Sequence, residues 1–80
     1  MADVELAHLI KMINQIADNI AIGEEADVAC EKLLIHIQRF WARSMKQRII
    51  QYANTGGGEL RPMARDAISQ LQDQSTNAAS

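Results

Sequence analysis

The cysteine and histidine side chains of this 80-residue chain, the first candidates for a nucleophile, a base or a zinc ligand, are His8, Cys30 and His36. A nucleophile needs a base within hydrogen-bonding reach, and a structural zinc site needs about four Cys or His ligands. Cys30 and His36 would be separated by about 240° around a helix, so they would lie on different faces. The lone cysteine also excludes an internal disulfide. The sequence therefore predicts no catalytic, cofactor-binding or metal site in this chain.

A second kind of chemistry is indicated by residues 36–45, which contain the only Phe and the only Trp, Phe40 and Trp41, between Arg39 and Arg43. Aromatic rings beside cations can hold single-stranded nucleic acid. They also suit a core or a protein interface, because aromatic side chains on a helical stripe usually pack. We favour packing, with both rings on the core-facing stripe, because a net charge of −2 argues against a dedicated nucleic-acid binder.

Charge is distributed unevenly along the chain. Residues 1–31 carry seven acids against Lys11 alone, a net charge of −6, whereas residues 32–58 carry five basic residues and no acid. An acidic first half that folds back on a basic middle is one explanation. A basic surface for an acidic partner or for nucleic acid is the other.

The length of the chain limits how stable it can be alone. Eighty residues form one small domain at most. At this size an apolar core contributes only about 3–5 kcal/mol, and natural proteins add disulfides, metals or partner subunits. Burial against a partner is the option left open by the residue types. The sequence shows no signal peptide and no apolar run near the ~20 residues that span a bilayer, so we expect a soluble, cytoplasmic protein.

The spacing of apolar residues predicts an all-α fold of four helices, two longer ones followed by two short ones. The first is expected over residues 4–22, with Gly23 ending it in a left-handed conformation. The second has its main apolar face toward the core, while Val28 and Ile35 fall on the opposite face. So short a chain has little material left to cover that second face, which indicates a partner.

The last two helices are bounded by capping and breaking residues. Ser44 and Gln47 have the spacing of a capping box, which predicts that the third helix covers residues 45–54. Three glycines at 56–58 end it, and Pro62 suits the first turn of the fourth helix.

The end of the chain lacks apolar periodicity. Residues 73–80 are polar and small, a composition that buries too little apolar surface to order the backbone. We therefore expect one helical domain over residues 1–72 and a disordered tail over residues 73–80.

Three blocks of residues occur in order between positions 11 and 67. The first is Lys11-Met12-Ile13-Asn14-Gln15-Ile16, the second runs from His36 to Met45, and the third comprises Gly57, Gly58, Leu60, Pro62, Met63, Arg65 and Ala67. With these blocks the chain resembles the delta subunit of the soluble, NAD-dependent, molybdenum-containing formate dehydrogenases. In that family the blocks read Lys/Arg-Met-Ala-Asn-Gln-Ile, His-Ile/Leu-Arg-Arg-Phe-Trp-Asp/Glu-Pro-Arg-Met and, after a Gly-rich turn, Leu-x-Pro-Leu-x-Arg-x-Ala.

The chain also departs from this pattern. Ile13 stands where the family has Ala, and Gln38 stands for the first Arg of its Arg-Arg pair. After Trp41 the family's Asp/Glu-Pro-Arg becomes residues 42–44, Ala-Arg-Ser. An acidic cap followed by Pro would start a helix directly after Trp41, whereas the box at Ser44 moves the expected start two residues later.

The resemblance implies an accessory subunit that is not an enzyme by itself. In such complexes a large subunit carries the molybdenum bis-pterin cofactor and iron–sulfur clusters and oxidises formate to carbon dioxide. Subunits with FMN and further iron–sulfur clusters pass the electrons to NAD. The delta subunit is expected to dock on the large subunit and to support assembly or stability of the complex, with no cofactor of its own.

The residues expected to contact a partner lie in or near these blocks and on the second face of the second helix. They are Asn14, Gln15, Val28, Ile35, His36, Arg39, Phe40, Trp41, Arg43, Met45, Arg48 and Arg65. The expected partners are protein subunits, chiefly the large one, and neither nucleic acid nor a membrane. Two other functions stay open: a small helical nucleic-acid-binding or regulatory module, and a helical protein that self-associates through its second apolar face.

Overall fold

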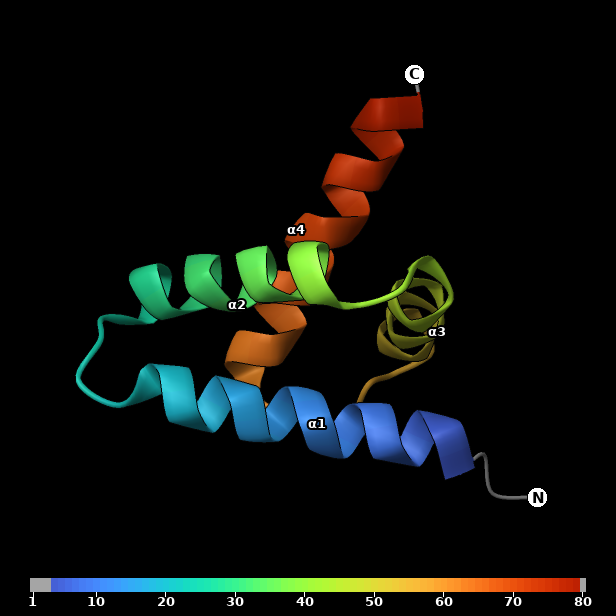
Figure 1. The fold of residues 1–80 in the computed structure, drawn as a ribbon. Helices are drawn as coiled ribbons and strands as arrows, with labels where there is room; N and C mark the ends of the chain where they lie inside the picture. The colour runs from blue at the N-terminus through green and yellow to red at the C-terminus, as the bar shows by residue number, and fades with distance from the viewer. Residues whose placement is uncertain (1–3, 80) are drawn as a thin grey trace.

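The computed structural model describes the backbone of residues 4–79 and the side chains of residues 4–74. Within those residues it contains no strand and four helices: α1 (Val4–Ala21), α2 (Ala26–Phe40), α3 (Arg43–Asn54) and α4 (Pro62–Ala79) (Figure 1). The predicted all-α fold of four helices is confirmed.

α1 and α2 form an antiparallel hairpin (Figure 1). α1 ends as predicted, because Gly23 has a φ of 74°, a left-handed conformation that glycine adopts without a steric penalty. α2 then begins at Ala26, with Glu25 in the N-cap position and Asp27 in the first turn. These carboxylates suit the positive end of the helix macrodipole.

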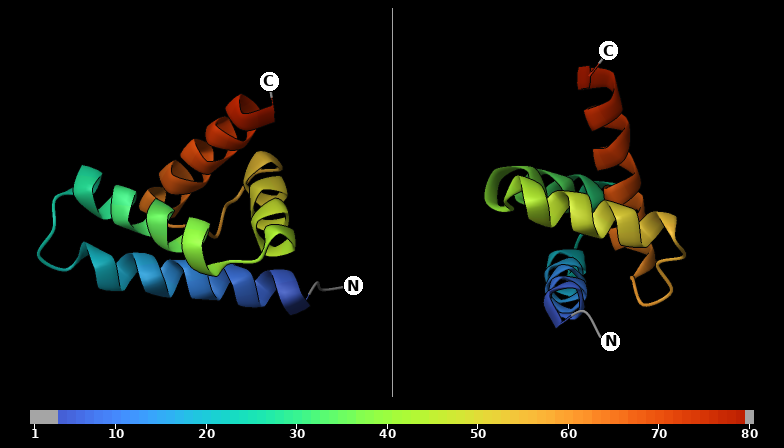
Figure 2. Two further views of the ribbon diagram at one scale, coloured as in Figure 1. Left: turned by 45° about the horizontal axis from the view of Figure 1, so that its top comes forward. Right: turned by 90° about the vertical axis from the view of Figure 1, so that its right-hand side faces the viewer.

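α4 crosses α2 and also contacts α1 and α3, so the four helices share one core (Figure 2). The apolar stripes predicted for the helices supply it. The buried residues of this core are Leu9, Ile10, Ile13, Ala17, Cys30, Leu33, Leu34, Ile37, Trp41, Ile49, Leu60, Ala64, Ala67, Ile68 and Leu71.

The predicted start of α3 is wrong. The helix begins at Arg43, and Ala42, with φ −64° and ψ 155°, occupies the N-cap position without a side-chain cap. The first turn is closed by the backbone N–H of Lys46, which donates to the carbonyl of Ala42 at 3.1 Å. Ser44 therefore lies inside the helix. α3 therefore starts at positions 42 and 43, where the family pattern has an acid and a proline, although this chain has neither.

The connection between α3 and α4 is built on glycine conformation and backbone carbonyls. Gly57 has a φ of 59°, and a Cβ there would lie 3.2 Å from both Ala53 Cα and Leu60 Cδ1. Arg65 Nη2 donates to the carbonyl oxygens of Gly56 at 2.7 Å and of Gly57 at 2.9 Å. The glycines therefore end α3 as predicted and also present carbonyls that a side chain of α4 binds.

Asn14 ties this connection to α1. Its Nδ2 donates to the carbonyl of Glu59 at 2.8 Å, and its Oδ1 accepts from the backbone N–H of Arg61 at 2.9 Å. The Arg61 guanidinium also donates twice to Asp18, at 3.2 and 3.3 Å. The Asn14 amide, which we expected to contact another chain, is therefore engaged within this one.

α4 is longer than predicted. Its buried stripe ends at Leu71, but the helix continues through Asp73 and Gln74 and has 18 residues, as many as α1. No Gly or Pro interrupts the sequence after Pro62, so nothing in the backbone forces an earlier end. The side chains of residues 75–79 and the whole of Ser80 lie outside the described residues, and the disorder predicted there stays a prediction.

Candidate interaction surface

α2 has a buried face and an exposed face that is partly apolar. The buried residues are Ala29, Cys30, Leu33, Leu34 and Ile37. On the other side, as predicted, Val28 is 38% and Ile35 is 42% exposed, and at the end of the helix Phe40 is 71% exposed. None of these three side chains belongs to the core cluster of the described residues or packs against it.

The two neighbouring rings at the end of α2 lie in different environments, which corrects the prediction that both face the core. Trp41 is only 5% exposed, in contrast to Phe40. Phe40 is the last helical residue, whereas Trp41 is the C-cap, with an extended backbone of φ −91° and ψ 135°. The chain therefore turns between them, and the indole packs into the core. The helical projection is therefore wrong for Phe40, the last residue of the helix, and right for Trp41, which reaches the core from an extended backbone.

His36 lies one turn before Phe40 and packs against it. The two ring centroids are 4.9 Å apart, with the planes tilted by 43°. Residues four apart on a helix are neighbours on its surface, so this contact restricts the otherwise exposed Phe40 ring. His36 is thus an aromatic neighbour here. No group of three or more His, Cys, Asp or Glu side chains that could hold a metal ion is found among the residues with described side chains.

Two of the five arginines make no interaction with any residue that the structure describes. The engaged ones are Arg48, which pairs with Glu5 (Nε–Oε1, 3.9 Å), and Arg61 and Arg65 with the partners given above. Arg39 and Arg43, on either side of the turn at Trp41, make no described hydrogen bond or ion pair. Residues 32–58 contain no acid, so neither guanidinium has a carboxylate nearby in the sequence. We give the name α2 corner to the residues around this turn that are exposed, Ile35, Arg39, Phe40 and Arg43, together with the half-buried His36.

The lysines near the α2 corner are engaged within the chain. Lys32 Nζ donates to Glu24 Oε1 at 2.7 Å, and Lys46 Nζ donates to the carbonyl of Gln38 at 3.1 Å. The basic middle of the sequence is thus partly paired with the acidic first half, which was the first of the two explanations offered for the uneven charge. The second explanation, a basic surface for a partner, still applies to the two arginines of the α2 corner.

The structure separates the other predicted contact residues from this corner. Gln15 is exposed on α1, where no described residue bonds to it. Val28 lies toward the opposite end of α2. Trp41 belongs to the core, and the half-buried Met45 packs against it. The twelve candidates therefore do not form one continuous surface, and five of them gather at the α2 corner.

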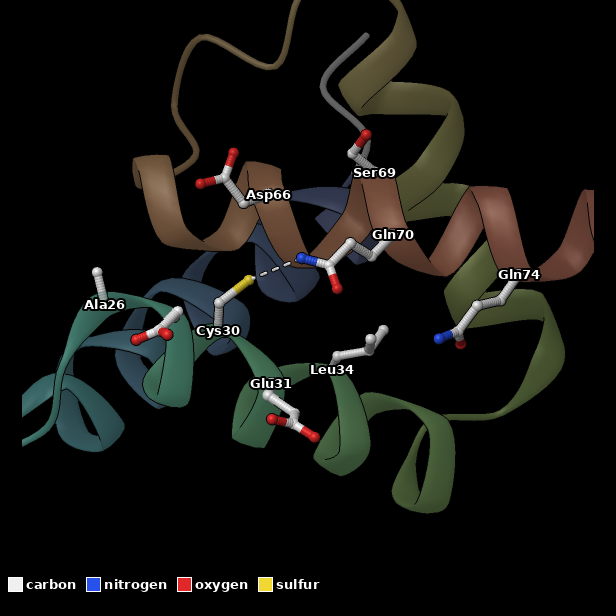
Figure 3. Close-up of a pocket in the computed structure, with 9 residues that line it drawn as sticks. Ala26, Cys30, Glu31, Leu34, Asp66, Ser69, Gln70 and Gln74 are labelled. Atoms are coloured by element: carbon white, nitrogen blue, oxygen red, sulfur yellow. Dashed lines mark hydrogen bonds between the residues drawn. The ribbon is translucent and has the colours of Figure 1, made fainter.

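A groove of about 700 Å³ lies between α2 and α4, lined in part by Cys30, Asp66 and Gln70 (Figure 3). Gln70 Nε2 donates to Cys30 Sγ at 3.5 Å. Burial, and then the Asp66 carboxylate, raise the pKa of the Cys30 thiol, which the bond from Gln70 only partly offsets. The thiol is therefore neutral near pH 7 and a poor nucleophile.

Sequence reasoning missed the exposure of Phe40, although the pattern contained an indication of it. An acid and a proline after Trp41 in the family pattern mark a helix start, and a new helix there requires the previous one to end at Trp41. A residue that ends a helix does not keep the direction given by the helical projection. The lack of partners for Arg39 and Arg43 had a weaker indication, the absence of acids in residues 32–58.

Residues 8–68 match the family model described as NADH-dependent formate dehydrogenase delta subunit FdsD. The matched range contains the whole of α2 and α3 and therefore the α2 corner. Neither the curated proteins nor the solved structures gave a significant match. None of the described helices has the length and hydrophobicity needed to cross a membrane. The family predicted from three ordered blocks of residues is confirmed, and the chain belongs to the FdsD family of formate dehydrogenase delta subunits.

Proposed function

We propose that this chain is a non-catalytic subunit that docks on the large, molybdenum-carrying subunit of a cytoplasmic NAD-dependent formate dehydrogenase and supports the assembly or stability of the complex. Membership of the delta-subunit family supports a place in such a complex. The subunit contacted and the role in assembly are inferred from the resemblance and from the surface described above.

The observation that carries docking is the presence of three exposed apolar side chains on α2. Isolated apolar residues on a surface are normal, but here Val28, Ile35 and Phe40 are all exposed on one helix of a very small domain. The most exposed of them stands between two arginines that have no described partner. Aromatic and arginine side chains are enriched where protein interfaces are strongest.

The cofactors of such complexes do not fit the residues of this chain. Iron–sulfur clusters are held by several cysteine thiolates, whereas Cys30 is the single cysteine and its thiol is kept neutral. The described side chains offer no cluster of ligands for a metal ion. Formate oxidation and electron transfer to NAD are therefore assigned to the other subunits in this proposal.

Purification from native cells tests the proposal. A tagged full-length chain, expressed from its own locus, is expected to recover the large molybdenum subunit, identified by mass spectrometry. Deletion of the gene is expected to lower the amount of assembled complex while formate oxidation per bound molybdenum stays the same. Recovery of the tagged chain without the large subunit would contradict the proposal.

Self-association is a second candidate, favoured by the same three exposed apolar side chains of α2. A homo-oligomer would bury Val28, Ile35 and Phe40 against a second copy of the chain. Light scattering on the purified chain separates the two cases. A monomer at micromolar concentration fits a subunit that lacks its partner, whereas a stable dimer that persists in cell extract, without other subunits, fits self-association.

A further inference from the structure

We propose that the α2 corner is the anchor of the contact with the partner subunit, and that the partner presents an apolar pocket for the Phe40 ring flanked by carboxylates for Arg39 and Arg43. This inference rests on the proposed docking function and states which surface docks and what chemistry it meets. Val28, at the other end of α2, is left outside this anchor.

Phe40 has the properties of an anchor residue. Its ring is 71% exposed, the largest exposed fraction among the big apolar side chains of α2. His36 packs against one side of it, at 4.9 Å between centroids, and so restricts its motion before any partner binds. A side chain that is already restricted loses less conformational entropy on binding, which favours affinity. Ile35, one turn before Arg39 on α2, is 42% exposed.

The two arginines of the α2 corner indicate which groups surround the pocket on the partner. Arg39 and Arg43 have no described partner, while the nearby cations of Lys32, Lys46 and Arg48 all have one. A guanidinium binds a carboxylate through two parallel hydrogen bonds, which give both strength and direction. No described carboxylate of the chain pairs with Arg39 or Arg43, so in this inference the carboxylates come from the partner.

The two arginines are held on rigid elements. Arg39 lies in the last turn of α2, and Arg43 is the first residue of α3. Between them, the buried Trp41 caps α2 and donates from its backbone N–H to the carbonyl of Ile37 at 3.1 Å. The junction of the helices is thus fixed by the core. Contact residues on fixed elements keep their geometry better than residues on loops.

A protein surface fits these features better than a nucleic acid. Phosphate backbones are bound by many cations together, whereas this corner offers only two arginines, Arg39 and Arg43, that bond to no described residue. The apolar Ile35 has no role on a sugar–phosphate backbone. The chain as a whole is acidic, with a net charge of −2.

The test uses full-length tagged chains in native cells that make the complex, with recovery of the large subunit as the readout. Phe40→Ala, Arg39→Glu and Arg43→Glu are each expected to lower that recovery by about tenfold or more. The variants should fold, because these side chains are exposed and the arginines bond to no described residue. Glu at position 43 moreover suits the N-terminus of α3, so it cannot act by unfolding that helix.

Two matched variants control for general effects. Ile22→Ala removes an apolar side chain that is 78% exposed beyond the end of α1, and Lys11→Glu makes the same charge change on the exposed surface of α1. Both are expected to recover the large subunit as well as the wild type does. Circular dichroism of each purified chain verifies that helix content is unchanged.

Each outcome decides a different point. Wild-type recovery of the large subunit with no loss in the three corner variants would overturn this inference and leave the proposed function intact. If only Phe40→Ala lowers recovery of the large subunit, the partner does not present carboxylates to Arg39 and Arg43. If the control variants lower recovery equally, the α2 corner is not the contact surface. If the wild type recovers no large subunit, the proposed function fails and this inference fails with it. Binding of the wild-type chain to RNA, abolished by the arginine substitutions, would replace the protein partner with a nucleic acid.

Discussion

Phe40 and Trp41 are neighbours in the chain, yet one ring lies in solvent and the other in the core. The cause is local, because the helix ends between them and the backbone of Trp41 is extended. Arginines divide in a similar way, according to whether an acid or a free carbonyl is within reach. The residue type therefore did not determine the surroundings of these side chains. The position relative to the helix end did so for the two rings, and the acceptors within reach did so for the arginines.

Truncation of the two rings is expected to have very unequal effects on stability. Trp41→Ala is expected to lower the free energy of unfolding by about 3–5 kcal/mol, since it leaves a large cavity in the core. Phe40→Ala is expected to change it by about 0.5 kcal/mol or less, as for other exposed side chains. The whole domain is expected to have a free energy of unfolding of only about 3–5 kcal/mol, so urea unfolding followed by circular dichroism should show little or no cooperative transition for Trp41→Ala and a nearly wild-type one for Phe40→Ala. Equal losses in the two variants would show that Phe40 is buried in solution.

The raised pKa of Cys30 predicts slow thiol chemistry. Less thiolate is present at any given pH than in an exposed cysteine, so alkylation by iodoacetamide at pH 8 should be far slower in the folded chain than in urea. The sign for stability follows from the same shift: the neutral thiol is favoured by folding, so stability is lost as the pH rises through the folded-state pKa. Equal alkylation rates in the folded and unfolded chains would contradict the burial of Cys30.

At the scale of elements, the helices were predictable and their ends were not. Apolar spacing gave all four helices, and Gly23 and Pro62 marked the correct boundaries. The capping box at Ser44 was a plausible pattern that the backbone did not use, because the end of α2 at Trp41 had already fixed where α3 begins. Local capping preferences are worth about 1 kcal/mol and yield to a buried residue next to them.

Because α3 starts without a side-chain cap, a capping residue at position 42 is expected to stabilise the domain. Ala42→Asp is expected to raise the free energy of unfolding by about 0.5–2 kcal/mol, because an aspartate at the N-cap accepts from the first free N–H groups. Adding Arg43→Pro should be tolerated, since position 43 is the first of the helix and the backbone of Ala42 is extended. Thermal unfolding measures both. A lower midpoint for Ala42→Asp would show that α3 starts elsewhere.

Gly57 and Gly58, in the α3–α4 connection, provide a matched pair of positions for substitution. Gly57→Ala is expected to cost about 1–3 kcal/mol, because φ is positive and the new Cβ would press against Ala53 and Leu60. Gly58→Ala should have little effect, since its φ is not positive and nothing lies within 4 Å of the added carbon. Chemical denaturation of the two variants gives the comparison. Similar losses at both positions would argue against this loop geometry.

The molecule as a whole is a small core with one side left uncovered. The sequence made the fold class, the family and the need for a partner predictable, since these depend on periodicity, ordered blocks and length. It could not show which cations lack partners, because that depends on distances between residues far apart in the chain, such as Arg61 and Asp18. The sequence thus predicted the segment that contains the candidate site, and only the structure showed which of its side chains are exposed at the α2 corner.

This size predicts that the partner stabilises the chain. Alone, the domain is expected to unfold with a free energy of about 3–5 kcal/mol. When the free partner is present at 100 times the dissociation constant, binding raises the free energy of unfolding of the chain by about 2.7 kcal/mol. Limited proteolysis of the isolated chain and of the purified complex, under identical conditions, should show cleavage only in the former. Equal resistance would mean that docking adds no stability.

The junction of α2 and α3 gives the molecule its own optical reporter. Trp41 is the only tryptophan of the chain, and its indole is buried at the point where the two arginine-bearing helices meet. Its fluorescence emission should accordingly be blue-shifted in the native state and move to longer wavelength only when that junction opens. Any partner that seats on the neighbouring Phe40 would alter the polarity around the same indole, so docking could be followed by intrinsic fluorescence, without a label.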